Sequence, residues 1–556
     1  MSETNRKKSG CGCLTFLGAA VLVVAGGAYF YFRVFSAKEL TPLEGAKVVP
    51  QEALIAAFIS TDSKSWSKLE KFGTPETQQL LGESIENWQA EISGDTEINY
   101  QTDLKPWLGN IMLAFLPSDK SVPAKEKYDM LMVAGIKNKL KALHFADRLK
   151  NQLTNQEGQQ IQQRQYRGIT IAEAKTEKSG VLSVAILGNQ LVLASERKTI
   201  ELAIDTFKGE PSFASKQGAK EILSQKLNIQ NPIAQIYLAD LAGVIQQAAL
   251  STPQGSEIPT EALQNLEQVK SVAIGVGVEE REVRFQAIAK LNPESIEQGF
   301  KPAKGKVLSE FPADTIGLIS GQGIGDIWSQ FVAQSGKDPD LQVLVGRVRQ
   351  FFQSMNLDVD KEVFGWLDGE FALGVIALEQ GSFSDLGLGG TIILETSDRQ
   401  TGQRTLEKLS QMAKFAPFIF VNQKNVRGTQ VTEWKTPRPG VMLAYGWLNN
   451  KSLLITLGAP FVEVMKAKSG TSLAQSNNFQ TITKSLPKTN LGYFYLDVEK
   501  AMSVANNLPQ ARANSIPPEA NAMLNSIQGI AVTATMPDKS TSQLDMVLSL
   551  EPKTRN

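Results

Sequence analysis

The hydrophobic pattern divides the chain into one long apolar run near the N-terminus and a body with shorter periods. The run, Leu14 to Phe32, spans nineteen residues without a charged residue or a proline. At about 1.5 Å of rise per residue, a helix of this length crosses the roughly 30 Å hydrocarbon core of a bilayer. The pattern therefore predicts a transmembrane helix, and we assign residues 14–34 to the anchor.

Downstream of the anchor, strand-like alternation and helical spacing follow one another. Ala53–Ser60 and Thr315–Ser320 predict strands, each followed by a helical stretch at a tryptophan, and Leu140, Leu143, Leu149 and Leu153 give Lys139–Leu153 a helical period. Gly188-Asn189 is typical of a hairpin turn. The other expected strands are 111–116, 128–136, 165–174, 181–187, 190–195, 272–278, 283–291, 371–377, 390–395, 530–536 and 543–550, and the other expected helices are 198–207, about 402–412 and 460–467. Because hairpins outnumber crossovers, we predict an α+β fold with mainly antiparallel sheets and helices on one face.

The same order of features occurs twice, about 260 residues apart. Trp66 and Trp328 are separated by 262 residues, Trp107 and Trp366 by 259, and the tyrosines of IYLAD and FYLDV by 258. A period of this length indicates a duplicated domain. The expected parts are a basic N-terminus (1–13), the anchor (14–34), a linker (35–46), a first repeat domain (47–293), a second linker (294–309), a second repeat domain (310–552) and a tail (553–556).

Charges beside the apolar run predict its orientation. Arg6, Lys7 and Lys8 precede the run, whereas the charges that follow it partly cancel. The positive-inside bias places the N-terminus in the cytoplasm and the body on the periplasmic or lumenal side. A cleavable signal peptide is the competing interpretation, but the run exceeds the usual core of about 7–15 residues, and Phe35 stands where a small residue should precede cleavage.

Composition narrows the class of the body. Lys plus Arg (57) balance Asp plus Glu (57), and 42% of residues are hydrophobic, so the chain has neither the charge of a nucleic-acid-binding protein nor the composition of a disordered one. Cys11 and Cys13 lie before the anchor, and no cysteine follows it. These two thiols are too few for a structural zinc site. Small residues at a helix entrance explain them, with lipidation or an intermolecular contact as alternatives.

Motifs for catalysis or metal binding are weak. The only histidine, His144, falls on the expected 139–153 helix, where a solvated position is the simpler explanation. Gly321-Gln-Gly323-Ile-Gly325 lacks the spacing of a dinucleotide fingerprint and the ending of a P-loop. An acidic neighbourhood lacks the EF-hand spacing and is interpreted as a solvated loop, with calcium as the alternative. Its members are Asp338, Asp340, Asp358, Asp360 and Glu362. We expect no cofactor, no metal and no catalytic set, although a carboxylate pair formed by folding stays open.

Two arginines recur at matching positions of the repeats. Arg167-Gly168 and Arg427-Gly428 are 260 residues apart. A turn between strands is the first interpretation of this pair, and an exposed arginine contact is the second. Arg167 and Arg427 are therefore the candidate interaction residues.

The anchor, the cysteine-free body and the paired tryptophan-containing repeats together resemble the membrane-anchored cyanobacterial proteins of domain-of-unknown-function family 3352. The resemblance covers nearly all of the chain and rests on its layout. It implies a cyanobacterial envelope or thylakoid setting, and a role beside photosynthetic complexes. It transfers no catalytic residues.

Two functions remain open from the sequence. The first is a non-enzymatic scaffold or assembly and maintenance factor, tethered to the bilayer by its helix, that binds a membrane-protein partner and no nucleic acid. The second is a carrier of an apolar ligand, or a hydrolase, with a cleft between sheet and helices. A deep pocket with convergent polar groups would favour the second function.

Overall fold

The structure is a computed structural model of the whole chain. It describes residues 39–69, 72–79, 99–117, 128–153, 161–176, 180–250, 258, 263, 266–292, 301–336, 338–377, 387–437, 441–467, 470–507 and 517–551. Outside these residues lie the predicted anchor Leu14–Phe32, its flanking Arg6, Lys7 and Lys8, and both cysteines. Among the helices of the described residues, none combines the length and the apolarity needed to cross a membrane.

Contacts divide the chain into two compact units. The first comprises Met1–Lys71, Gln78–Glu279 and Gln286–Ser295, and the second comprises Phe72–Thr77, Glu280–Phe285 and Ile296–Asn556.

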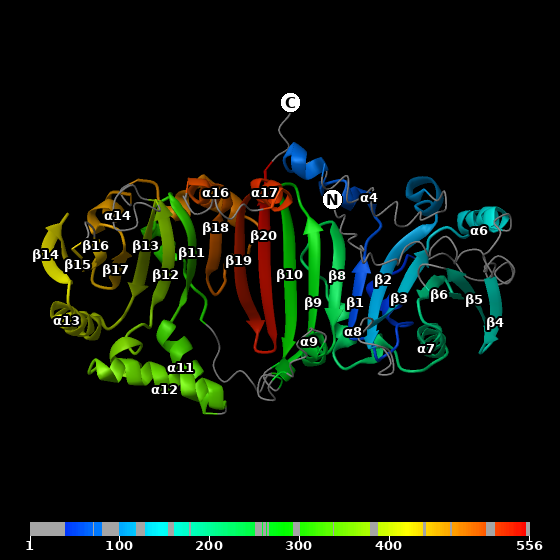
Figure 1. The fold of residues 1–556 in the computed structure, drawn as a ribbon, viewed down its shortest axis with the longest axis horizontal. Helices are drawn as coiled ribbons and strands as arrows, with labels where there is room; N and C mark the ends of the chain where they lie inside the picture. The colour runs from blue at the N-terminus through cyan, green and yellow to red at the C-terminus, as the bar shows by residue number, and fades with distance from the viewer. Residues whose placement is uncertain are drawn as a thin grey trace, which may run out of the picture. The chain divides into compact units, whose positions relative to one another are not determined.

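The first unit is built on an antiparallel sheet. Its strands are β1 (Ile55–Ile59), β2 (Leu108–Pro117), β3 (Tyr128–Ile136), β4 (Ile161–Tyr166), β5 (Ile169–Thr176), β6 (Gly180–Leu187), β7 (Gln190–Ala194), β8 (Pro232–Leu238), β9 (Val269–Val278) and β10 (Glu282–Leu291), the start of which is grouped with the second unit. Pairing gives the order β10-β9-β8-β1-β2-β3-β7-β6-β5-β4 (Figure 1). All registers from β9 to β4 are antiparallel.

Helices cover both faces of the β3-β7-β6 part of this sheet. The helical segments of the first unit are α3 (Pro42–Ala46), α4 (Ser63–Trp66), the π-helical turn η2 (Tyr100–Leu104), α6 (Lys139–Leu153), α7 (Arg197–Phe207), η3 (Phe213–Ser215), α8 (Ala219–Leu223) and α9 (Leu241–Leu250). Ile200 of α7 packs in one core cluster with Val133 and Val192, while Phe145 of α6 packs in another with Met132. The prediction of helices on one face was therefore incomplete, because strands that are apolar on both sides must be buried on both sides.

The second unit repeats this strand order. Its strands are β11 (Thr315–Gln322), β12 (Glu370–Ala377), β13 (Leu388–Glu395), β14 (Phe420–Val426), β15 (Thr429–Lys435), β16 (Val441–Trp447), β17 (Ser452–Leu457), β18 (Tyr493–Asp497), β19 (Ile527–Asp538) and β20 (Thr541–Leu550). They pair in the order β20-β19-β18-β11-β12-β13-β17-β16-β15-β14, all antiparallel (Figure 1). The predicted α+β class with antiparallel sheets is confirmed.

Two core clusters lie on opposite faces of the second sheet. The helical segments of this unit are η5 (Lys306–Glu310), α11 (Ile324–Ser335), α12 (Pro339–Ser354), the π-helical turn η6 (Val359–Val363), α13 (Arg399–Phe415), α14 (Phe461–Ala467), η8 (Leu473–Gln475), α15 (Asn477–Thr483), α16 (Val498–Asn507) and α17 (Pro518–Asn525). Phe461 of α14 and Phe479 of α15 join the cluster that holds Leu318 and Tyr495. Leu406 of α13 joins the smaller cluster around Trp366.

Both expected linkers contribute to the cores. Thr41 caps α3 and Pro42 occupies its first turn, and Ala46 at its end is fully buried. In the second expected linker, Val307 and Leu308 of η5 are buried in the cluster around Leu318. Isolated apolar residues in polar stretches gave too weak a periodic signal to predict these short elements.

We predict opposite effects for two glycine-to-alanine substitutions in the second unit. Gly428 has a φ of +85°, with no atom near the position of an added Cβ, so Gly428→Ala should destabilise the unit through backbone strain alone, by about 1–2 kcal/mol. Gly346 is exposed within α12 and also has open space, so Gly346→Ala should stabilise it by about 0.5–1 kcal/mol. Urea unfolding of both variants measures the difference. Equal effects would contradict the described hairpin.

Candidate functional site

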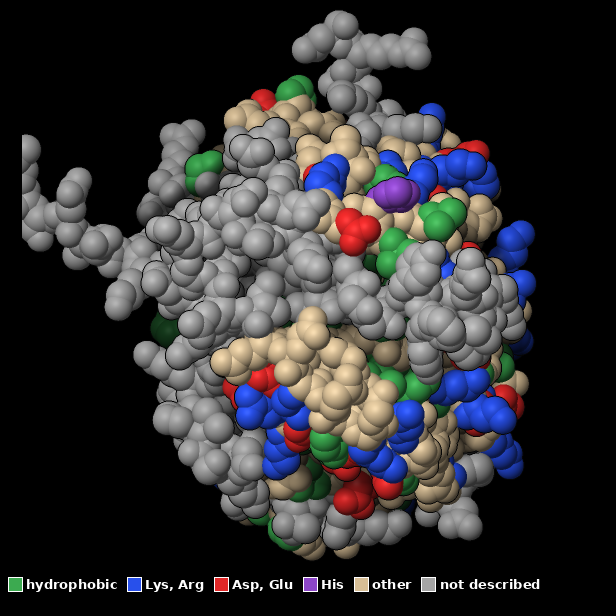
Figure 2. All heavy atoms as spheres, turned by 90° about the vertical axis from the view of Figure 1, so that its right-hand side faces the viewer, with side chains coloured by type: hydrophobic (Ala, Val, Ile, Leu, Met, Phe, Trp, Pro, Cys, Tyr) green, Lys and Arg blue, Asp and Glu red, His purple; other side chains and the backbone are tan. Residues whose placement is uncertain are grey.

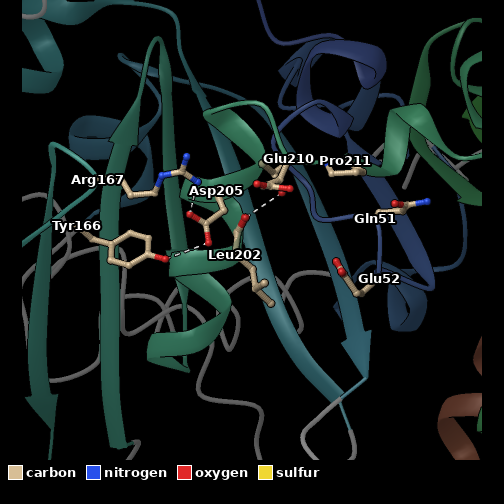
Figure 3. A pocket seen from close by; sticks show the side chains of 9 residues that line it. Gln51, Glu52, Tyr166, Arg167, Leu202, Asp205, Glu210 and Pro211 are labelled. Atoms are coloured by element: carbon tan, nitrogen blue, oxygen red, sulfur yellow. Dashed lines mark hydrogen bonds and ion pairs between the residues drawn. The ribbon is translucent and has the colours of Figure 1, made fainter.

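A half-open hollow of about 420 Å³ lies in the first unit. Its lining comes from the segment before β1, from the β4–β5 turn and from α7 with the residues that follow it: Gln51, Glu52, Tyr166, Arg167, Leu202, Asp205, Thr206, Glu210 and Pro211 (Figure 3). The predicted interaction residue Arg167 is thus placed at this hollow. Polar and charged side chains dominate the lining.

The arginine stands in a tight hairpin turn. Arg167 and Gly168 both have positive φ, at 46° and 77°, as the two central residues of a type I′ turn require. The corresponding Arg427 and Gly428 have φ values of 52° and 85° between β14 and β15. The first interpretation, a turn between strands, is confirmed for Arg167, which also faces the hollow.

Asp205 of α7 organises the polar wall of the hollow. It accepts hydrogen bonds from the Arg167 guanidinium (2.8 Å) and from the Tyr166 hydroxyl (3.0 Å), as Figure 3 shows. The hydrogen bond to Asp205 raises the pKa of Tyr166 and that of Arg167. Tyr166 therefore stays protonated and Arg167 stays charged at neutral pH, which suits binding of a polar group.

The second unit does not rebuild this wall. Arg427 donates to the backbone carbonyl of Met465, at 3.2 Å, and Met465 stands where the first unit has Asp205. Val426 replaces Tyr166. The two candidate arginines share their turn, but only Arg167 belongs to a charged wall.

Ion pairs continue from the hollow across β4, β5 and α7. Glu173, which is buried, binds Arg164 at 2.7 Å and Arg197 at 2.6 Å, and Arg164 also binds Glu201. Burial raises the pKa of Glu173, but the hydrogen bonds from Arg197 and Arg164 outweigh burial and leave the pKa lowered. Figure 2 shows Lys and Arg interspersed with Asp and Glu on this face. The charges compensate one another locally.

The acidic neighbourhood of the second repeat serves as a structural cap. The Asp358 carboxylate accepts hydrogen bonds from the backbone N–H groups of Asp360 and Lys361, which caps η6. In turn, the Glu362 carboxylate accepts a hydrogen bond from the Asp358 backbone N–H. Asp360 accepts from the indole of Trp328. The first repeat uses Asn99 and Asp103 in the same way. Within the described residues, no group of acidic, cysteine or histidine side chains could hold a metal ion.

Two other sequence candidates have structural explanations. His144 is exposed on α6. Gly323, with φ +67°, is the N-cap residue before α11, and a Cβ at Gly325 would come within 2.5 Å of the Phe364 carbonyl oxygen. The glycines of this stretch thus allow the backbone at the start of α11 to pack closely against the backbone at Phe364.

Folding also brings together a carboxylate pair that the sequence could not reveal. Glu370 is buried at the start of β12 and accepts hydrogen bonds from the backbone of Lys306 (2.8 Å) and Val307 (3.3 Å). Burial, followed by the charge of Glu370, raises the pKa of Glu395. Glu370 thereby caps the start of η5, and its negative charge favours the protonated form of Glu395.

An exposed apolar row on the sheet of the second unit is the other candidate surface. Ile319 of β11 lies directly opposite Leu373 of β12 and Phe494 of β18, and the three side chains are 54%, 43% and 40% exposed. Because directly opposed residues share a face, they project together, away from the Leu318–Tyr495 core. Val375, two residues after Leu373, projects from the same face and is also exposed. We call Ile319, Leu373, Val375 and Phe494 the open face.

The first unit covers the matching row. Ala57 of β1 lies opposite Leu113 and Ile236, and all three are half-buried. Leu113 packs against the cluster around Trp107. Exposure of the row is therefore a property of the second unit and not of the strand order.

A family model described as "Protein of unknown function (DUF3352)" matches residues 15–550. The chain belongs to the DUF3352 family. This confirms the family that the sequence resembles, while the cyanobacterial and membrane setting stays a prediction. A search of curated proteins finds no match to this DUF3352 chain.

Solved structures give only distant similarities to this DUF3352 protein. Crystal form III of TP0453 matches with a TM-score of 0.27 at 11% identity, covering 46% of this chain and 81% of that one. Crystal form IV matches with a TM-score of 0.26 at 9% identity, over the same shares. These values are too low to inform the fold or the function.

The carboxylate pair predicts a pH-dependent stability difference. The pKa of Glu395 is higher in the folded chain than in the unfolded chain, where it is about 4.3. Its ionisation therefore lowers the stability of the fold as pH rises above about 4.3, and the full loss is reached above the folded-state pKa. Glu395→Gln should therefore raise the melting temperature at pH 7, and the gain should vanish near pH 4.

Glu362→Gln is the matched control of opposite sign. The hydrogen bond from Lys408 is the main cause that lowers the pKa of Glu362, so its stabilisation is present above the unfolded pKa and is lost as pH falls through the folded pKa. This variant should melt lower at pH 7. If both variants shifted the melting temperature in the same direction at pH 7, the assigned carboxylate environments would be wrong.

Proposed function

We propose that this protein is a membrane-anchored, non-enzymatic scaffold or assembly and maintenance factor. In this proposal, Leu14–Phe32 holds the chain in a cyanobacterial envelope or thylakoid membrane, and the body works on the periplasmic or lumenal side. Its partner is a membrane protein, with photosynthetic complexes as the class that the family resemblance suggests.

The open face is the observation that supports this proposal. Isolated exposed apolar residues are ordinary, whereas neighbouring ones on a rigid sheet are typical of interaction sites. Ile319, Leu373 and Phe494 come from three adjacent strands, so their spacing is fixed by the sheet. A flat apolar row of this kind fits an apolar segment of a partner protein, because binding removes its area from water without ordering a flexible loop.

The charges in the hollow disfavour one form of the alternative, the carrier of an apolar ligand. The wall of the hollow presents Glu52, Asp205, Arg167 and Glu210, and Leu202 is the main aliphatic group. An apolar ligand would have to strip water from these charges at a cost.

The proposal predicts site-specific crosslinking in native membranes. A photo-reactive benzoylphenylalanine at Phe494 or Leu373 of the full chain should give one shared protein adduct. The same amino acid at Leu140, an exposed position on α6 of the first unit, should not give that adduct.

A second substitution on the open face tests whether the adduct depends on it. Ile319→Asp in the chain labelled at Phe494 should reduce the adduct about tenfold, which corresponds to a loss of about 1.4 kcal/mol of binding. Because the Ile319 side chain is already exposed, the melting temperature of the Ile319→Asp variant should be nearly unchanged. Identical products from Phe494 and Leu140, or an adduct insensitive to Ile319→Asp, would contradict the proposal.

A further inference from the structure

The two most exposed large apolar side chains among the described residues, Phe415 and Phe418, lie between the end of α13 and the start of β14, next to the exposed Phe420. Phe415, Phe418 and Phe420 are 89%, 74% and 58% exposed. Phe415 is the last residue of α13, and Phe420 is the first residue of β14, which forms the edge of the sheet in this unit (Figure 1). We call these three phenylalanines the aromatic tip.

The backbone of the tip is held in an unfavourable conformation. Phe418 has a φ of +67°, in the left-handed region where a bulky residue is strained. Local hydrogen bonds maintain the bend, since Ala416 donates to the Ala413 carbonyl and Ile419 donates to the Ala416 carbonyl. An asparagine or glycine would fit Phe418's position with less strain. Selection for backbone geometry alone therefore does not explain a phenylalanine there.

The first repeat shows that the fold does not need these rings. At the matching positions of its sequence stand Asn155, Gly158 and Gln160. Both repeats nevertheless form the same helix-to-hairpin order, α6 with β4–β5 and α13 with β14–β15. The three phenylalanines are thus an addition of the second unit, located on its surface.

Charges around the tip indicate what it contacts. Lys414 directly precedes Phe415, and residues 413–421 contain no acidic side chain. Lys435 lies opposite Phe420 across the strand pair and forms an ion pair with the buried Glu433. Aromatic rings flanked by lysines fit a bilayer surface with anionic headgroups, where rings enter the headgroup region and ammonium groups meet phosphate. We propose that the aromatic tip inserts into the surface of an anionic bilayer. The tip then acts as a second, reversible membrane contact of a chain that the sequence tethers at Leu14–Phe32.

The test uses the full chain reconstituted into vesicles that contain no other protein. An environment-sensitive fluorophore is attached at Phe420→Cys in a chain that carries Cys11→Ser and Cys13→Ser. With vesicles of phosphatidylcholine and phosphatidylglycerol, its emission should shift to the blue, and nitroxide groups on the lipid acyl chains should quench it. A fluorophore at Leu140→Cys, on α6, should show neither change.

Two further variants separate the tip's membrane contact from folding. Phe418→Asn should abolish the blue shift while keeping or raising the melting temperature, because asparagine tolerates a positive φ. Lys414→Gln should weaken membrane contact of the tip about fivefold, the factor expected for one lysine near an anionic surface. It should have no effect in pure phosphatidylcholine.

Several results would overturn the inference. Emission at Phe420→Cys typical of water in both kinds of vesicle would do so. So would a blue shift that rises with protein density without acyl-chain quenching, because a second copy of the chain would then cover the tip. Since these vesicles hold no partner protein, the outcome is independent of the scaffold proposal, and crosslinking at Phe494 is unaffected by it.

Discussion

The pleat of the sheet in the second unit determines which side chains enter its core and which are left for interaction with a partner. Leu318 and Tyr495 face each other across β11 and β18 and point into the large core, so their sequence neighbours Ile319 and Phe494 must point the other way. A one-residue slip would exchange the two sets, and the burial of Tyr495 makes such a slip costly. The same register that buries Leu318 and Tyr495 therefore places Ile319 and Phe494 together on the opposite face.

The opposite face of this sheet is buried by helices over some strands and exposed over others. At β13, β16 and β17, the cluster around Trp366 and Leu406 covers that face, and η6 with its acidic cap holds α13 in place through Thr405 and Glu362. Across β12, β11 and β18 the row stays exposed. The first unit has the same strand order, but its matching row is half-buried, and Leu113 of that row packs against the Trp107 cluster. The two units thus share a strand order, and the second carries the exposed apolar groups on its sheet and at the end of α13.

Much of the local structure could be predicted from the sequence. The expected helix Lys139–Leu153 and strand Tyr128–Ile136 coincide with α6 and β3, and the Gly188-Asn189 turn joins β6 to β7. The Arg-Gly turns were also recognisable, because that hairpin position requires positive φ. Residues 165–174, expected as one strand-like piece, instead contain the β4–β5 turn.

The open face and the polar sites could not be predicted from the sequence, for a physical reason. TIGLISGQ of β11 and YFYLD of β18 are apolar on both faces, a pattern typical of strands buried on both sides, and only tertiary packing shows that one side stays open. The Glu370–Glu395 pair and the Asp205 wall join residues far apart in the chain, which periodicity cannot detect.

Hydroxyl-radical footprinting of Phe494 and Tyr495 tests the central claim most directly. These adjacent residues lie on opposite faces of one strand, so each is the other's control. In the isolated full chain, Phe494 should be oxidised while Tyr495 is protected. In native membranes, a bound partner should protect Phe494 as well, with oxidation of the exposed Leu140 unchanged. Oxidation of Phe494 that is equal in the isolated chain and in native membranes would contradict the account.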